Sequence, residues 1–296
     1  MSAGTLHMII ASLVFSVAYS FIKILTRELG FWETAFLRGA LGFIILSTWL
    51  LRVRQPVLGH RANVWPLVSR GLFGGVAMIL YFWSLKMTTL ANASSLHYAH
   101  PLFTTFLAVP FLGERLNRGK VILVLLAMSG VLLIVQPTPA LLKVGSLPAL
   151  ASALFASLAY VSISFVSSRE HPAAIINALS FATMVLAAPM TLLAWTTPSP
   201  RLWGFVLVAG VLTTVAQFFM TMAYKLEQAS TVSAFSFTSI LWSLMIGALV
   251  FGEIPDRLEA FGIFILFGSL IALVLVRSRA ASRTEVQEAV IVPKDI

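Results

Sequence analysis

The sequence predicts an all-α integral membrane protein whose ten transmembrane helices form two inverted five-helix repeats, with both termini in the cytoplasm. Three observations predict this fold: the composition, the spacing of apolar segments, and an internal repeat. Hydrophobic residues make up 59% of the 296 residues and charged residues 10%, against roughly 25% charged residues in a soluble domain. So few charges cannot cover a soluble protein of this length, which excludes soluble enzymes, disordered proteins and DNA-binding modules.

Apolar stretches separated by short polar breaks predict the individual helices. A helical span needs about 20 apolar residues, and these stretches lack the two-residue alternation of membrane strands. No basic segment precedes the first stretch and no cleavage site follows it, so we expect a retained span rather than a signal peptide. The predicted helices cover residues 5–25, 32–51, 66–85, 90–111, 119–136, 145–166, 173–196, 202–224, 229–251 and 258–276.

Lysine and arginine residues predict the orientation, because cytoplasmic loops carry an excess of them. With the N-terminus in the cytoplasm, the cytoplasmic segments hold more of these residues than the outer segments. Arg70 is assigned to a cytoplasmic helix end and Arg38 to the outer side. The basic loops also account for the net charge of +9, so no nucleic-acid partner is expected. The absence of cysteine excludes disulfides and cysteine-based metal sites.

The two halves of the sequence resemble each other. Leu112–Glu114 is similar to Phe251–Glu253, and at the same spacing Lys86 corresponds to Lys225. Because five is an odd number of helices, the second half must enter the membrane upside down. In such inverted-repeat transporters the substrate site lies near the midplane, between the repeats. The predicted units are a first repeat over 1–140, a second, inverted repeat over 141–276 and a polar cytoplasmic tail over 277–296.

Four motifs in the first half resemble a known family. They are Ala91–Leu96, Pro101–Thr104, Leu112–Leu116 and Gly130–Ile134. This pattern resembles the EamA-type repeat of the drug/metabolite transporter (DMT) superfamily, and the second half carries a weaker copy that begins at Ala229. The resemblance implies ten helices with cytoplasmic termini, and alternating access around a central cavity lined by the fourth and ninth helices. It also implies export of amino acids and other metabolites, or exchange of solutes.

His97 and His100 are candidates for the substrate site. They are three residues apart and therefore share one face of the predicted fourth helix. The repeat relates them to Ser236 and Ser239 in the ninth helix, so all four side chains are expected to face one cavity. Histidine titrates near neutral pH, which makes His97 a candidate for proton coupling as well. Alternatively, the histidines bond neighbouring helices, and the serines allow close helix packing.

Three further residues have two interpretations each. Arg38 could bind a substrate carboxylate or phosphate, whose geometry its guanidinium matches. Alternatively it pairs with Glu33 or extends to the outer interface. Glu33 is a second candidate for proton coupling, or is simply interfacial. Pro101 removes one helix hydrogen bond, which predicts either a gating hinge or a passive kink.

Aromatic residues could stack on a flat or cationic substrate, and we select Tyr19, Tyr81, Tyr98 and Trp242 for this role. Tryptophan and tyrosine near span ends otherwise belong to interfacial belts. No metal site is expected, because His97 and His100 have no third histidine or carboxylate at a useful spacing. No cofactor is expected either.

These features predict a secondary active transporter and no enzyme, since G-x-S-x-G, H-E-x-x-H and nucleotide-binding motifs are absent. Our preferred interpretation is proton-coupled export of small organic, amino-acid-like metabolites. The alternative is an exchanger or uptake carrier for an anionic metabolite, for which Arg38 is the evidence. The expected partners are the substrate, protons or a counter-substrate, and the lipid bilayer of a bacterial inner membrane. The apolar fifth and tenth predicted helices would face lipid or form a homodimer.

Overall fold

The computed structural model describes residues 2–87, 93, 96–114, 117–135, 146–242, 245, 257–258, 260–273 and 275. All regular structure in these ranges is helical, and none of them contains a strand. Six helices of this part are long and apolar enough to span a membrane. The repeated segment Phe251–Glu253 and the predicted tail 277–296 lie outside the described residues.

The helices of the described residues follow one another along the chain. Their bounds are α1 (Ala3–Glu28), α2 (Phe31–Arg52), η1 (Arg61–Asn63), α3 (Val64–Met87), α5 (His100–Leu112), α6 (Arg118–Val135), α7 (Ser146–Val166), α8 (Pro172–Leu193), α9 (Pro200–Leu226), α10 (Ala229–Phe235) and a helix over Ala260–Leu273. Seven predicted spans correspond to α1, α2, α3, α6, α7, α8 and α9. Their ends agree with the bounds of these helices to within three residues. Apolar length therefore locates these helices well.

Local capping explains several of the helix ends. The Ser2 side chain accepts a hydrogen bond from the Thr5 N–H at the start of α1, and Ser199 accepts one from the Leu202 N–H at the start of α9. Such bonds satisfy backbone donors that have no partner inside the helix. Gly113 ends α5 with a φ of 67°, a left-handed conformation that glycine adopts without strain.

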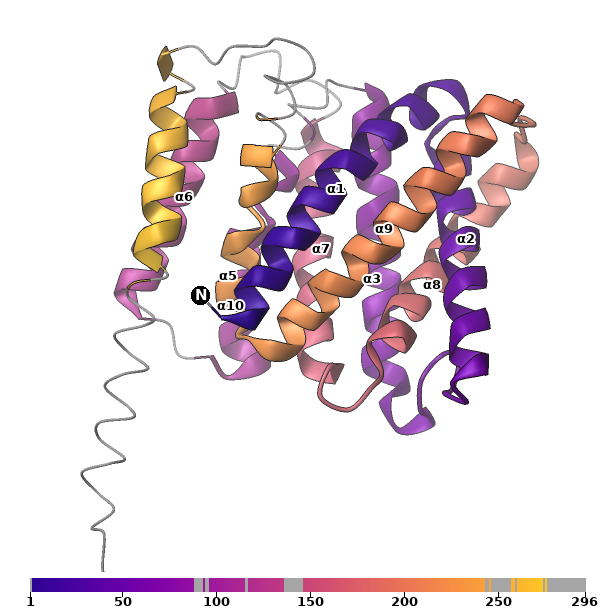
Figure 1. The fold of residues 1–296 in the computed structure, drawn as a ribbon, viewed down its shortest axis with the longest axis horizontal. Coiled ribbons are helices and arrows are strands. Elements are labelled where there is room, and N and C mark those ends of the chain that lie inside the picture. Colours follow the sequence, from indigo (N-terminus) through magenta and orange to yellow (C-terminus); the bar gives the residue numbers. More distant parts are fainter. Residues whose placement is uncertain are drawn as a thin grey trace, which may run out of the picture.

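Helices of the two halves of the chain pack against each other. α1 lies mainly along α9, α2 along α8, and α3 along α7 and α8. α5 contacts α7 and α10. Figure 1 shows α1 and α9 crossing the front of the bundle together, with α3 and α8 behind them. The two halves therefore share one interface and do not form separate cores.

The fourth predicted helix, 90–111, is not continuous, which corrects the prediction. Tyr98 and Ala99 form a turn, and α5 begins only at His100. The Ala99 N–H donates to the Leu96 carbonyl at 3.1 Å, so this bond spans three residues where an α-helix spans four. Pro101 lies in the first turn of α5, where its missing N–H costs little. The break therefore precedes the proline.

The ninth predicted helix, 229–251, also breaks, and it does so without a proline. α10 ends at Phe235, residues 236 and 237 form a turn, and helical structure resumes over residues 238–242. The Ser236 hydroxyl donates to the Ser233 carbonyl at 2.6 Å, and the Thr238 hydroxyl to the Phe235 carbonyl at 2.7 Å. Hydroxyl bonds to the preceding turn compete with the helical ladder. They give a physical reason for the break that a hydropathy profile does not show.

α6 and the helix Ala260–Leu273 form a pair at one edge of the bundle, at the left of Figure 1. They meet at two glycines: a Cβ atom at Gly130 would lie 2.8 Å from the Gly262 carbonyl oxygen, and one at Gly262 would lie 2.7 Å from the Gly130 carbonyl oxygen. The outward faces of the pair are apolar and exposed, including Ile122 and Phe264. Small residues let two helix backbones approach closely in a membrane.

Candidate functional site

A cavity lies between the helices of the two halves. Its volume, counted as the space that the centres of water molecules can occupy, is about 40 Å³. This is enough for a few waters. Its wall comes from α1, α2, α3, α7, α8 and α9, together with the residue His97. The lining residues are Phe15, Tyr19, Arg38, Arg70, Gly74, Ala77, Met78, Tyr81, Phe82, His97, Ala156, Ala159, Tyr160, Leu179, Thr213 and Gln217.

Arg38 enters the cavity from α2. The residue is 7% exposed, and its Nη1 contacts the sulfur of Met78 on α3. Thioether sulfur is a weak hydrogen-bond acceptor, so this contact leaves most of the donor capacity of the guanidinium unused. In the described part of the chain Arg38 forms no ion pair with Glu33. Its burial in the cavity wall also argues against an extension to the outer interface.

Arg70 enters the same cavity from α3, and this corrects its assignment to a cytoplasmic helix end. The residue is 1% exposed and is among the largest fully buried side chains. Its Nη2 donates to the Gln217 Oε1 of α9 at 2.9 Å, whereas its buried Nε has no partner among the described residues. Sequence reasoning had a signal here, because an arginine inside an apolar span is costly and therefore suggests a function.

The two arginines give the cavity a strong positive character. Neither has a carboxylate partner in the part of the chain that the structure describes. Moving a guanidinium out of water is unfavourable by several kcal/mol unless a counter-charge and hydrogen bonds compensate for it. An anion or a strongly polar group in the cavity would provide that compensation.

His97 faces the cavity with a definite hydrogen-bonding state. Its Nδ1 lies 2.8 Å from the Ser152 hydroxyl oxygen. The Ser152 hydroxyl donates its one hydrogen bond to the Ala149 carbonyl at 2.6 Å, so its oxygen accepts a hydrogen bond from His97. A neutral His97 ring therefore carries its proton on Nδ1 and presents Nε2 as an acceptor. The ring also contacts Tyr81, with the two ring centroids 4.5 Å apart.

His100 and the two predicted serines lie beside this cavity and do not line it. The His100 Nε2 is 3.3 Å from the Ser236 hydroxyl, which donates to the Ser233 carbonyl and thus accepts from histidine. Ser239 contacts α1, since its carbonyl accepts from Ser16 at 3.1 Å. Tyr98 is buried near Ser239. These four residues join the two broken helices and α1, and their predicted roles in substrate binding stay predictions.

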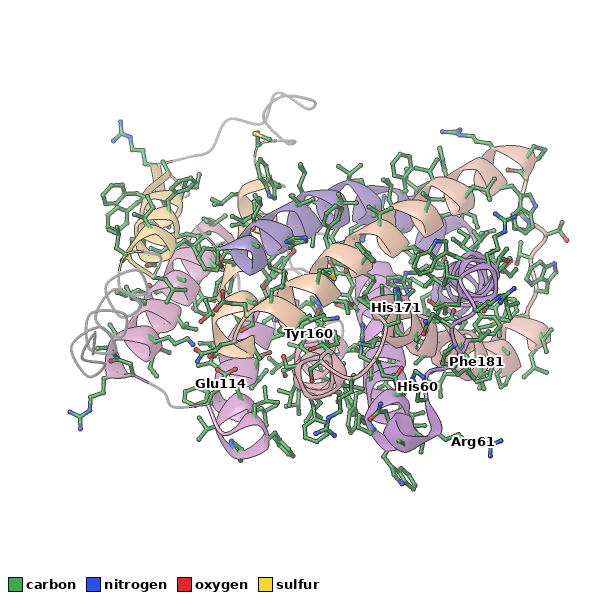
Figure 2. The ribbon with its side chains drawn as sticks, turned by 60° about the horizontal axis from the view of Figure 1, so that its bottom comes forward. His60, Arg61, Glu114, Tyr160, His171 and Phe181 are labelled. Carbon is green, nitrogen blue, oxygen red and sulfur yellow. The ribbon has the colours of Figure 1, made fainter. Side chains whose placement is uncertain are left out.

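Aromatic side chains form one wall of the cavity. Tyr19 stacks on Phe15 with a centroid distance of 5.5 Å and meets Tyr81 edge-on at 5.2 Å. Tyr160 on α7 contacts His100 at 5.0 Å, and Figure 2 shows Tyr160 near the middle of the bundle. Such rings offer an apolar surface with hydroxyl groups at its edge.

The remaining candidates lie away from the cavity. The Trp242 Nε1 donates to the Ile9 carbonyl at 3.3 Å and so attaches the second broken helix to α1. Glu33, at the start of α2, accepts a hydrogen bond from the Thr196 N–H at 3.2 Å. Pro101 sits in the first turn of α5. Neither the coupling role of Glu33 nor the hinge role of Pro101 is tested by these contacts.

Membrane-spanning helices around a buried, charged cavity define a membrane transporter. Two parts of the chain, residues 2–136 and 143–275, match the EamA-like transporter family. The chain therefore belongs to the EamA-like transporter family of the DMT superfamily, as its motifs suggested, and it is not an enzyme.

Several relatives are named transporters. The pseudopaline exporter CntI of Pseudomonas aeruginosa is 31% identical over 275 residues, covering 92% of this chain and 96% of that protein. The riboflavin transporter of Vibrio cholerae is 25% identical and covers 85% of this chain and 86% of its own. The S-adenosylmethionine uptake transporter of Rickettsia conorii is 23% identical and covers 92% of each.

Solved structures share this fold, and a crystal structure among them matches nearly the whole chain. It matches with a TM-score of 0.77 and 22% sequence identity, and covers 95% of this chain and 99% of its own.

Proposed function

We propose that this protein is a secondary active transporter that exports small organic metabolites by alternating access, with its substrate site in the central cavity. The buried cavity that contains Arg38, Arg70 and His97 carries the proposal, because a carrier site is expected where two repeats meet near the midplane. Ten helices in two inverted repeats and cytoplasmic termini are part of this proposal.

The pairing of helices supports the inverted repeats. In such an arrangement the first and third helices of one repeat correspond to the first and third of the other. The packing of α1 on α9 then corresponds to the packing of α7 on α3, and both pairs are extensive. The α2–α8 and α5–α10 contacts each join corresponding helices. One pseudo-twofold axis accounts for all four.

Charged residues support the orientation. The Ser2 hydroxyl donates to Glu227 at 2.8 Å, so the N-terminus lies beside the end of α9. The end of α2, the start of α3 and the end of α7 lie at this end of the bundle, the lower one in Figure 1. The exposed residues Arg52, Arg61 and Arg169 lie at or next to these helix ends. Figure 2 shows Arg61 extending away from the protein. Basic residues mark the cytoplasmic side. Arg38 and Arg70 are buried, so the count of lysine and arginine residues loses one residue on the outer side and one on the cytoplasmic side, and its bias is unchanged.

The two broken helices support a substrate site whose surrounding helices change position during transport. Both breaks lie next to residues that contact the cavity region, at Tyr98–Ala99 and at residues 236–237. Discontinuous helices with irregular backbone at the substrate site are common among transporters built from repeats. The named relatives include an exporter and an uptake carrier, so export rests on the more similar of the two.

Energy coupling has two versions. In the preferred version a proton binds to His97, which lines the cavity, or to Glu33. In the second version a counter-substrate takes the place of the proton. The membrane is proposed to be a bacterial inner membrane, and the outward faces of α6 and Ala260–Leu273 are proposed to contact lipid or a second copy.

An untargeted comparison of metabolites in cells and medium tests the function, with the protein overproduced or absent. The cavity-filling variant Ala159→Phe should abolish any difference, because Ala159 lines the cavity and a larger side chain would occupy the substrate's place. Leu154→Phe on the lipid side of α7 is the matched control, since Leu154 is exposed. A compound enriched in the medium supports export, and one enriched in the cells reverses the direction. A wild-type difference that Ala159→Phe leaves intact would place the site elsewhere.

A further inference from the structure

We infer that the cavity binds an organic anion with two negative charges, held between Arg38 and Arg70. This inference names the substrate class of the proposed transport site and therefore rests on the proposed function. It depends on Arg70, which the distribution of lysine and arginine residues along the sequence assigned to a cytoplasmic helix end.

The first argument is charge balance. Every described acidic residue lies away from the cavity wall. Glu28 is exposed at the end of α1, and the other four carboxylates have partners of their own. Glu33 accepts from Thr196, Glu114 from Ala229, Glu170 from His60, and Glu227 from Ser2. The two buried guanidinium groups thus have no counter-charge among the described residues, and an anionic ligand would supply one.

The second argument is the unused donor capacity of both side chains. A guanidinium has five N–H donors. The described bonds of Arg70 use one nitrogen toward Gln217, and Arg38 meets only the weakly accepting sulfur of Met78. The Nε of Arg70 is buried without a described partner. A carboxylate can accept two parallel N–H bonds from such a fork, which gives the contact both energy and geometry.

The third argument is space. A Cβ atom at position 74 would overlap the Arg70 Nη1 and approach Leu179 Cδ1. Glycine at this position therefore leaves room for the guanidinium beside the cavity. Because arginines reach the cavity from two different helices, α2 and α3, a ligand with a short carbon skeleton can place one anionic group at each. The rings of Phe15, Tyr19 and Tyr81 provide an apolar surface for that skeleton.

Two negative charges fit better than one. A single carboxylate would leave one buried guanidinium without compensation, and an uncompensated charge in a closed, low-dielectric cavity is strongly unfavourable. A dicarboxylate and a phosphomonoester share the required chemistry, so the test separates these two sources.

The experiment measures the melting temperature of the purified full-length protein in detergent at constant ionic strength. The probes are succinate, glutarate and adipate, a phosphomonoester (glycerol 3-phosphate), the monocarboxylate butyrate, and the neutral diamide succinamide. Ligand that binds only the folded protein raises its stability. We expect at least one dianion at about 10 mM to raise the melting temperature by about 3 °C or more. Butyrate should raise it less, and succinamide should have no effect.

Variants tie the effect to the two arginines. Arg38→Gln and Arg70→Gln should each remove the stabilisation by the dianion. The matched controls, Arg52→Gln on α2 and Lys86→Gln on α3, should keep it, because both residues are exposed at helix ends. Where Arg70→Gln does not fold, Gly74→Ala replaces it. That variant keeps the charge but displaces the guanidinium, and it should raise the dissociation constant at least tenfold.

The outcomes separate the inference from the proposed function. Stabilisation by dianions that requires both arginines supports the inference. Equal stabilisation by succinamide, or a dianion effect that survives Arg38→Gln and Arg70→Gln, overturns it, and so does the absence of any shift with every dianion. None of these results decides whether the protein is a transporter, which the metabolite comparison tests separately. Arginine-dependent binding without any change in metabolite distribution would keep the anion site and reject transport.

Discussion

The cavity region and the pair formed by α6 and Ala260–Leu273 solve opposite problems in the same membrane. The cavity buries two arginines and a histidine, and the Nε of Arg70 has no partner among the described residues. The pair buries no charge at its contact, and two glycines bring its backbones together. Incomplete polar bonding costs stability and leaves groups available to a substrate, whereas backbone contact contributes packing alone. Substitutions should therefore separate transport from folding according to region.

The largest expected effect is on folding, at the glycine contact. Gly262→Val would place side-chain carbons where a Cβ atom already lies 2.7 Å from the Gly130 carbonyl oxygen. Because backbone cannot move aside cheaply, we expect most of the folded protein to be lost. The yield of monodisperse protein in size-exclusion chromatography measures this. Gly268→Val on the same helix is the control, since a Cβ atom there meets nothing within 4 Å. Similar losses in both variants would contradict the role of the contact.

The next effect is on transport, at His97. His97→Ala removes the imidazole that lines the cavity, together with its bond to Ser152. We expect the rate of transport to fall about tenfold, which corresponds to the loss of one hydrogen bond to the substrate, with the yield and the melting temperature nearly unchanged. Ser152→Ala keeps the imidazole and removes only its partner, so it should reduce transport less. A fall in the melting temperature that parallels the loss of transport would show that His97 serves packing.

A smaller transport effect concerns substrate choice, at Arg38. Arg38→Lys keeps the positive charge but loses the planar fork that can bind a carboxylate through two bonds. We expect the affinity for dianions to fall by about 1 kcal/mol or more, in line with the strength of charged hydrogen bonds, and neutral solutes to be unaffected. Competition between labelled and unlabelled solutes in proteoliposomes measures the difference. Equal weakening for charged and neutral solutes would reject an anion site at Arg38.

The smallest effect is on stability in acid, at a loop contact outside both regions. Glu170 has a fully buried side chain that accepts hydrogen bonds from the His60 and Asn63 groups. Burial raises the pKa of this carboxyl, but the hydrogen bonds from Asn63 and His60 lower it more, so its pKa lies below the ordinary value of 4.5. Because the pKa of Glu170 is lower in the folded than in the unfolded protein, the ionised carboxylate stabilises the fold above about pH 4.5. This contribution is lost as the pH falls further and the carboxylate becomes protonated.

Melting curves between neutral pH and about pH 3.5 test the contact. The wild type should lose stability in the acidic range, and Glu170→Gln should lose less of it while starting from a lower value. Glu28→Gln, an exposed carboxylate at the end of α1, is the control. Identical acid profiles for wild type and Glu170→Gln would exclude a role of this carboxylate in stability.

Apolar length predicted most of the fold, because a membrane imposes it on every spanning helix. It could not predict the break at residues 236–237, since serine and threonine hydroxyls that bond the preceding turn have the same sequence signature as serines that pack between helices. Glycines such as Gly130 and Gly262 were visible in the sequence, but their mutual contact depends on the pairing of two distant helices.

The candidate site was predictable only in part. Arg38, His97, Tyr19 and Tyr81 were selected by their residue type inside apolar spans, and the structure places all four on the cavity wall. Arg70 lies two turns into α3, and the comparison of lysine and arginine residues on the two sides of the membrane counted it with the cytoplasmic loops. It was therefore assigned to a helix end, although it is buried. Its burial follows from the packing of α3 on α7 and α8, which one sequence does not specify.

The fixed positions of Arg38 and Arg70 have an electrical consequence. In the proposed alternating-access cycle the gates move around these charges, so the membrane voltage acts on any half cycle in which the charges are uncompensated, with about 2.3 kcal/mol for each full charge and 100 mV. A bound dianion makes the loaded cavity close to neutral, so the voltage acts mainly on the empty carrier. Flux from proteoliposomes that is unchanged under an imposed potassium diffusion potential would contradict this. An inside-negative voltage would favour the empty carrier open to the cytoplasm, ready to load the next molecule for export.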